Sequence, residues 1–171
     1  MKSLLKSGII LTIATAALPV MAEERVNAFQ DWAVYEESNP KTCWISSSPQ
    51  KTENSRDGKP RTVTRGEIVL SVSYQADKSI VGEVSFAGGY PFDPDRYVKM
   101  TIGTQSFDLR PVGETAWPEN PSVDQTVRVA MTKGATAVLT ARSTRNTDTK
   151  DTFSLKGFTA ALNDAKQRCG I

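Results

Sequence analysis

The residues best suited to chemistry in this sequence are its two cysteines, Cys43 and Cys169, which stand far apart in the chain. Thiols serve as redox groups, as metal ligands or as the two halves of a disulfide, and the compartment largely decides between these roles. No C-x-x-C motif is present, and neither cysteine lies in an evident electropositive pocket. If the chain is exported, we therefore expect a structural Cys43–Cys169 disulfide that ties the C-terminal tail to an early strand.

The sequence contains no histidine, which removes the commonest general base and the commonest metal ligand. Ser-His-Asp and Cys-His arrangements are thereby excluded, and no G-x-S-x-G, Walker A or dinucleotide-binding motif occurs. Acidic residues, serines and lysines are plentiful, so a carboxylate pair or a Ser-Lys mechanism stays open. Nothing in their spacing separates a catalytic pair from a solvated surface, and we expect neither a catalytic site nor a cofactor.

Two carboxylates, Asp93 and Asp95, occur in the segment GGYPFDPDRY, residues 88–97. Calcium sites are built from several such oxygen ligands. Pro94 stands between the two carboxylates and further ligands are missing, so a turn with Asx-type hydrogen bonds explains the pair better than a cation site. We expect no bound metal here.

Aromatic residues next to prolines form the second candidate site. Tyr90 and Phe92 lie in the same segment, and Trp117 lies in ETAWPENP. Aromatic side chains in loops often contact partners, but they also close the ends of β-sandwich cores. Tyr90, Phe92 and Trp117 are therefore a candidate recognition patch, with core packing as the alternative.

The N-terminus has the three parts of a secretory signal peptide. Lys2 and Lys6 provide the positive charge, Gly8–Leu18 is apolar, and small residues lead up to Ala22. The apolar run is too short for an ordinary membrane span. We expect cleavage between Ala22 and Glu23, with export to the periplasm or beyond and no membrane span in the mature chain.

Removal of the signal also changes the charge. The full chain has 21 Lys and Arg against 19 Asp and Glu, and Lys2 and Lys6 leave with the signal. The mature chain is then formally neutral, whereas nucleic acids and anionic membranes attract proteins with a basic surplus. We therefore expect the partner to be a protein or an envelope or host-surface ligand, not a nucleic acid.

Apolar residues alternate with polar ones along most of the mature chain, which predicts β-strands. The polar segment 49–64 is either a mobile excursion or two strand ends that meet at Asp57-Gly58, and 143–153 is predicted to be a solvated hairpin tip. The predicted strands are Phe29–Tyr35, Thr42–Ile45, Glu67–Tyr74, Ile80–Phe86, Tyr97–Ile102, Ser106–Leu109, Ala135–Arg142 and Asp151–Leu155.

Two short helices are predicted at about 121–133 and 157–168. The first has Asn120-Pro121 as its start and Gly134 as its stop, and the second has an apolar face that includes Phe158 and Leu162. Many short strands with two helices indicate a mainly β fold, an antiparallel β-sandwich or β-barrel-like domain. We expect a signal peptide at 1–22 and a single domain at 23–171.

The chain also resembles a known family. FQDWAVY is followed by a cysteine, and MTKGATAVLTARSTRNTDTKDTFSLKGFTAAL stands near the C-terminus. This pattern resembles the invasion-associated locus B family of alphaproteobacterial periplasmic proteins, from Asn27 to Ile171 and most specifically over Gly134–Leu162. Many relatives carry further cysteines in mid-chain that are absent here, so the resemblance does not itself assign the disulfide.

The resemblance implies a β-rich periplasmic or secreted domain without established enzymatic activity, in a family named after members that assist entry into host cells. The resemblance implies no catalytic residue, because the positions that recur in the family are interpreted as core and turn residues. In this sequence they are Trp32, Gly157, Phe158, Ala161 and Leu162. We therefore expect a disulfide-closed, non-catalytic binding protein of the bacterial envelope, with a role in host interaction or envelope maintenance. The alternatives are an envelope hydrolase and a structural subunit of an envelope complex.

Overall fold

The structure is a computed structural model that describes residues 24–171, so the predicted signal peptide and its predicted cleavage site between Ala22 and Glu23 lie outside the described residues. Its elements are β1 Glu24–Phe29, β2 Trp32–Ser38, β3 Lys41–Ser47, β4 Lys51–Arg56, β5 Lys59–Pro60, β6 Val69–Gln75, β7 Val81–Ala87, β8 Val98–Ile102, β9 Gln105–Val112, β10 Thr115–Trp117, α1 Pro121–Lys133, β11 Thr136–Arg142, β12 Asp148–Ser154 and α2 Phe158–Cys169. No helix within residues 24–171 is long and apolar enough to cross a membrane.

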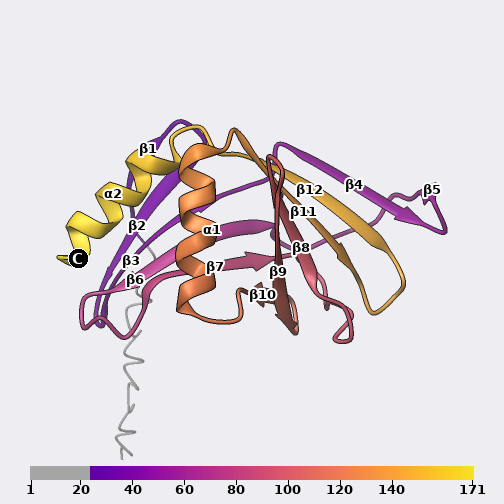
Figure 1. Ribbon diagram of the computed structural model, residues 1–171, viewed down its shortest axis with the longest axis horizontal. Coiled ribbons are helices and arrows are strands. Elements are labelled where there is room, and N and C mark those ends of the chain that lie inside the picture. The colour runs from indigo at the N-terminus through magenta and orange to yellow at the C-terminus, as the bar shows by residue number, and fades with distance from the viewer. Residues whose placement is uncertain (1–23) are drawn as a thin grey trace, which may run out of the picture.

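The strands form one antiparallel 12-stranded sheet in the order β1-β2-β3-β6-β7-β10-β9-β8-β11-β12-β4-β5 (Figure 1). Strand β9 links its two halves, because Gln105–Leu109 pair with β8 whereas Arg110–Val112 pair with β10. We call β1, β2, β3, β6, β7 and β10 the first half-sheet, and β8, β9, β11, β12, β4 and β5 the second.

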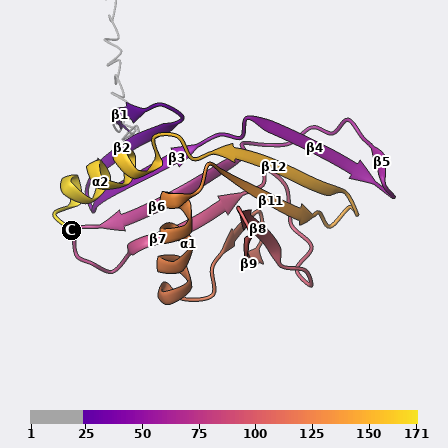
Figure 2. The same cartoon turned by 45° about the horizontal axis from the view of Figure 1, so that its top comes forward.

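The two half-sheets face each other across one core. Phe86 on β7 contacts Phe153 on β12, edge to face, with ring centroids 6.0 Å apart. Both rings are fully buried, and such aromatic contacts add to the apolar burial that holds facing sheets together. The predicted mainly antiparallel, sandwich-like fold is confirmed. The β4–β5 hairpin extends away from the end of the molecule that carries α2 (Figure 2).

Both predicted helices are present and both contact the first half-sheet. Helix α1 lies against β7, and α2 lies against β1, β2, β3 and β6. The start of α1 is set by Asn120, whose side chain accepts hydrogen bonds from the backbone N–H groups of Ser122 and Val123. These bonds satisfy donors that the first turn of a helix leaves free.

The turn before α2 explains several residues of the family pattern. Gly157 has φ +87°, and a Cβ atom there would lie 1.9 Å from the carbonyl oxygen of Phe29, so only glycine fits. Trp32 donates from Nε1 to the carbonyl of Ser154 and meets the Phe158 ring edge to face at 4.9 Å. With Ala161 and Leu162 also buried, these positions are core and turn, as the resemblance implies.

Three local predictions need correction or a choice. The predicted strand Phe29–Tyr35 is wrong in part, because Gln30, with φ 52°, turns the chain there and separates β1 from β2. In 49–64 the second alternative is found, since β4 and β5 meet at Asp57-Gly58. The segment 143–153 is a hairpin tip only at its start, because β12 begins at Asp148 and Asp151 is fully buried.

A buried carboxylate anchors α1 to the sheet. Asp124 is 7 % exposed, and its Oδ1 accepts a 2.7 Å hydrogen bond from the backbone N–H of Val84. Burial raises the pKa of Asp124 above 3.8, although the Val84 bond and the Arg128 charge act in the opposite direction. Burial and the Asp124 charge together raise the pKa of Glu83 as well.

We expect replacement of Asp124 by Asn to change the pH dependence of stability. A carboxyl group whose pKa is raised by folding favours the folded state below its unfolded pKa, and this contribution is lost as pH rises through the folded pKa. Asn keeps an oxygen for the Val84 N–H but carries no charge. The free energy of unfolding of Asp124→Asn should therefore rise relative to that of the native protein from about pH 4 upward. Urea unfolding of both proteins at several pH values measures this, and a constant difference between the two would contradict it.

Candidate binding site

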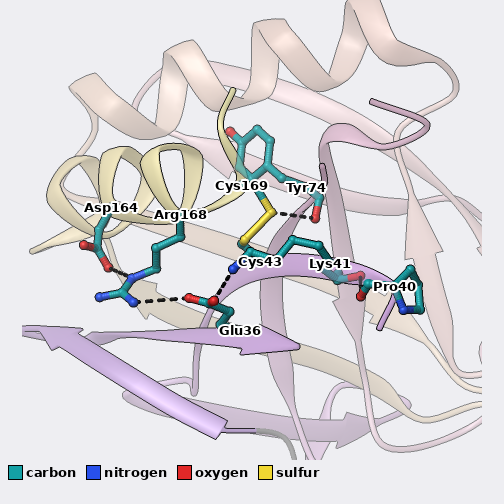
Figure 3. The surroundings of a disulfide bond; sticks show 9 residues. Glu36, Pro40, Lys41, Cys43, Tyr74, Asp164, Arg168 and Cys169 are labelled. Atoms are coloured by element: carbon teal, nitrogen blue, oxygen red, sulfur yellow. Dashed lines mark hydrogen bonds and ion pairs between the residues drawn. A yellow bond between two sulfur atoms is a disulfide. The ribbon is translucent and has the colours of Figure 1, made fainter. Parts of the chain in front are cut away.

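The Cys43–Cys169 disulfide is present and fixes α2 to the first half-sheet. It joins the third residue of β3 to the last residue of α2, with Cα atoms 5.9 Å apart (Figure 3). Cys43 is fully buried and Cys169 is 4 % exposed. The sulfur of Cys169 lies 3.6 Å from the carbonyl oxygen of Tyr74. A buried sulfur pair beside a packed strand suits a structural bond and offers no access for thiol exchange.

Ion pairs beside the disulfide fasten the same helix at its exposed side. Arg168 of α2 donates to Glu36 of β2 at 3.2 Å and to Asp164 at 2.7 Å, and Lys41 also bonds to Glu36 (Figure 3). The Lys41 and Arg168 contacts lower the pKa of Glu36 despite partial desolvation. The four side chains are only partly buried, so the group positions the tail and contributes modestly to stability.

A groove lies on the outer face of the second half-sheet. Register places Lys99 on β8 beside Thr140 on β11, Thr140 beside Lys150 on β12, and Lys150 beside Glu53 on β4. Partners directly across an antiparallel pair share a face, so these side chains form one row pointing away from the core. The hollow over this row measures about 900 Å³ and reaches the β4–β5 turn and Tyr97.

The groove is more basic than the chain as a whole, which has 21 Lys and Arg against 19 Asp and Glu. Its cationic lining residues are Arg61, Arg96, Lys99, Arg142 and Lys150, against two acidic ones, Glu53 and Asp148. Lys150 and Glu53 are 3.7 Å apart, and Arg142 and Asp148 are 3.6 Å apart. The Lys150–Glu53 pair is exposed and weak at this separation, so it leaves Lys150 free for a ligand, whereas Lys99 is hydrogen-bonded to Asp108 at 2.8 Å. Arg61 makes no ion pair within residues 24–171.

Hydroxyl groups and one aromatic ring complete the groove. Ser55 and Thr140, which the strand register places on the outer face, contribute hydroxyls to the lining. Tyr97 is 52 % exposed, and Arg110 holds its ring from behind, with Cζ 5.6 Å from the ring centroid and a 3.2 Å hydrogen bond to the hydroxyl. An exposed ring in a fixed orientation can stack on a flat apolar face, while the hydroxyls and cations engage polar groups.

The predicted aromatic patch is only partly at the surface. Phe92 is 3 % exposed and packs against Phe86, so it is a core residue and its assignment to a recognition patch is wrong. The half-buried Tyr90 packs edge to face on Phe92, with ring centroids 5.0 Å apart. Trp117 is half-buried on β10. Phe92 belongs to the core and Tyr90 packs against it, so the alternative interpretation, core packing, holds for these two residues.

The carboxylates in 88–97 form a turn. The Oδ1 of Asp93 accepts from the backbone N–H of Asp95 at 3.1 Å, and Arg96 lies 3.5 Å from the other oxygen. These contacts use Asp93 in the Asx-type turn that the sequence predicts. Within residues 24–171, no group of three or more acidic or cysteine side chains is arranged to hold a metal ion.

The comparisons with known proteins agree with the fold. The family model described as Invasion associated locus B (IalB) protein matches residues 111–166, a range that contains the segment where the sequence pattern is most specific. The crystal structure of invasion associated protein b from Bartonella henselae is similar to this chain at a TM-score of 0.55 and 15% identity, covering 82% of this chain and 95% of that one. No curated protein matches the sequence significantly. The chain thus resembles the invasion-associated locus B family, in fold over most of its length and in sequence over residues 111–166.

Proposed function

We propose that this chain is an exported, non-catalytic binding protein of the bacterial envelope, and that its outer-face groove binds an acidic oligosaccharide of the envelope or of a host surface. The observation that carries the proposal is the gathering of Arg61, Arg96, Lys99, Arg142 and Lys150 around one open hollow, although the mature chain is formally neutral. A local excess of cations attracts and orients anionic ligands. The signal-like N-terminus and the buried disulfide support an extracytoplasmic location.

The groove chemistry favours a sugar chain among anionic ligands. Carboxylates, sulfates or phosphates on the sugars would meet the cations, and sugar hydroxyls would meet Ser55 and Thr140. The exposed Tyr97 ring, held by Arg110, offers a platform for the apolar face of one sugar ring. An acidic peptide would use the cations but would have no need of the ring and the hydroxyl row.

A carboxylate hydrolase has less support. Such an enzyme needs two acidic side chains at a cleft, one with a raised pKa. Asp124 and Glu83 both have raised pKa values, but neither lines the groove, and Asp124 is occupied by the N–H of Val84. Glu53 and Asp148, which do line the groove, each lie near a cation. A structural subunit would instead co-purify with its complex in fixed stoichiometry.

Binding of defined oligosaccharides to the mature protein tests the proposal. We expect calorimetry to detect a short oligogalacturonate, which bears one carboxylate per sugar, and to detect weaker binding in high salt. Replacing Arg61 and Lys150 together by Gln should weaken binding about tenfold, because each exposed charge contact contributes up to about 1 kcal/mol. Lys78→Gln, an exposed change outside the groove, should leave the affinity unchanged.

Two further ligands make the test decisive. A neutral cello-oligosaccharide of the same length should bind far more weakly, since it lacks the charges. Oligoglutamate should bind more weakly than oligogalacturonate and should be insensitive to Tyr97→Ala. Equal affinity for all three ligands, or release of shortened sugar chains during incubation, would contradict the proposal.

A further inference from the structure

A second hollow, of about 480 Å³, lies on the inner face of the second half-sheet, beyond the end of the apolar core. Along β12, Thr149 and Asp151 are buried and point inward, whereas Lys150 is exposed and points into the outer groove. The hollow is enclosed by the segments 63–65 and 89–91. The two hollows therefore lie on opposite faces of the sheet, with Thr149 of β12 lining both.

The segments that cover this hollow are held at a fixed spacing. Gly66 donates from its backbone N–H to the carbonyl of Gly89 at 2.8 Å. A Cβ atom on Gly89 would lie 2.6 Å from the Gly66 carbonyl oxygen, and Gly89 has φ +71°. Glycine is thus required for the close approach of the two backbones. The cavity is preformed, as small-molecule sites usually are.

One wall of the hollow is held by a buried ion pair, in which the charges of Arg65 and Asp151 cancel. Arg65 donates from Nη1 and Nη2 to the two carboxylate oxygens of Asp151, both at 2.7 Å, and donates to the carbonyl of Gly88 at 2.7 and 2.9 Å. The Tyr90 ring lies 4.9 Å from Arg65 Cζ, and the Tyr90 and Thr149 hydroxyls are 2.5 Å apart. The charge of Arg65 and most of its donors are occupied by these contacts. This wall therefore contributes the shape of the hollow and the aromatic surface of Tyr90, but no free charge for a ligand.

The lining also includes two further cations, Arg56 and Arg145, and one carboxylate, Glu114. Arg56 donates from Nη2 to the hydroxyl of Thr147 at 3.0 Å, but its Nε is buried and has no hydrogen-bond partner. Neither Arg56 nor Arg145, at the exposed rim, forms an ion pair within residues 24–171. A buried N–H donor without a partner is costly, and a guanidinium group is suited to two parallel bonds to an oxyanion.

We propose that this hollow, which we call the arginine hollow, binds a small organic anion whose carboxylate or phosphate group is held by Arg56 and Arg145. The remainder of the ligand lies along the Tyr90 ring. The volume is much larger than a bare inorganic anion requires and falls within the usual range for small-molecule sites. The inference goes beyond the groove proposal, because it concerns a different face and a different class of ligand.

Calorimetric titration of the mature, disulfide-bonded protein tests the arginine hollow. The probes are glucose 6-phosphate, citrate and inorganic phosphate. We expect one of the two organic anions to bind, which distinguishes a phosphate ligand from a carboxylate ligand, and inorganic phosphate to bind at least tenfold more weakly. Arg145→Gln, which alters only an exposed side chain, should weaken organic-anion binding about tenfold, as expected for the loss of one charge-assisted contact.

Two matched variants complete the test. Arg56→Gln should weaken the same ligand at least as much as Arg145→Gln, with an unchanged near-ultraviolet circular dichroism spectrum as the check on folding. Arg61→Gln in the outer groove should leave this affinity unchanged. The result therefore tests the arginine hollow independently of the proposal that the outer groove binds an oligosaccharide. Absence of binding by both organic anions, equal binding of inorganic phosphate, or indifference of binding to Arg145→Gln would overturn the proposal.

Discussion

Replacement of Cys169 by Ser is expected to lower the free energy of unfolding by up to about 4–5 kcal/mol, the loop-closure contribution for a cross-link that spans a loop of this length. The bond joins positions separated by 126 residues, so it restricts nearly the whole unfolded chain. For a domain of this size the melting temperature should fall by about 10 °C. Urea and thermal unfolding of the oxidised mature protein measure both quantities.

In Cys169→Ser, local unfolding should begin at the C-terminus. Helix α2 is one of the last elements, and the disulfide anchors its final residue, so amide hydrogen exchange should accelerate in α2 before it does in β3. Gln167→Ser is the matched control, because it changes an exposed residue of the same turn and should shift stability by no more than about 0.5 kcal/mol. Two free thiols in the native protein, or equal melting of the two variants, would contradict the assignment.

Elements with an apolar face could be predicted from the sequence. Strand β6 alternates strictly, with Leu70, Val72 and Tyr74 buried, and α1 has both its Asn120 cap and its Gly134 stop. The split between β1 and β2 was missed because the turn is made by Gln30 with positive φ, a residue type that carries no turn signal. Element boundaries could therefore be predicted only where a capping or turn-forming residue type marks them.

Strand β4 shows why the rest was harder to predict. Its sequence, KTENSR, lacks apolar alternation because its inner face borders the polar arginine hollow, where Asn54 and Arg56 contact polar partners. Strand periodicity appears only where one face meets an apolar core. The sequence therefore predicts this strand only as one of two alternatives for 49–64, although the strand is well formed.

The outer groove could not be predicted from spacing either. Its cations come from β8, β11, β12 and the segments beside β5 and β8, and only the strand order β8-β11-β12-β4 makes them neighbours. The overall net charge of +2 gives no indication of the groove, since a chain with nearly balanced charges can still gather its cations on one face. The buried partner of Asp151 is likewise Arg65, 86 positions away, so neither residue looks unusual in its own segment.

Asp151 is also the position where a single substitution should be most damaging after the disulfide. Its side chain is fully buried and that of Arg65 is 6 % exposed. Asp151→Ala would leave the Arg65 guanidinium buried without its counter-charge, which typically lowers stability by about 3–5 kcal/mol. Urea unfolding at neutral pH should show this loss, accompanied by faster exchange of amides in the segments 63–66 and 88–90 that Arg65 connects to β12.

The matched control lies on the same strand. Asp148 is exposed and stands 3.6 Å from Arg142, so Asp148→Ala should change stability by no more than about 1 kcal/mol. Replacing both members of the buried pair by apolar residues, Arg65→Met with Asp151→Leu, should recover much of the loss, because no uncompensated charge then remains inside. If Asp151→Ala is as mild as Asp148→Ala, the pair does not hold the covering segments in place, and the preformed shape of the arginine hollow has another cause.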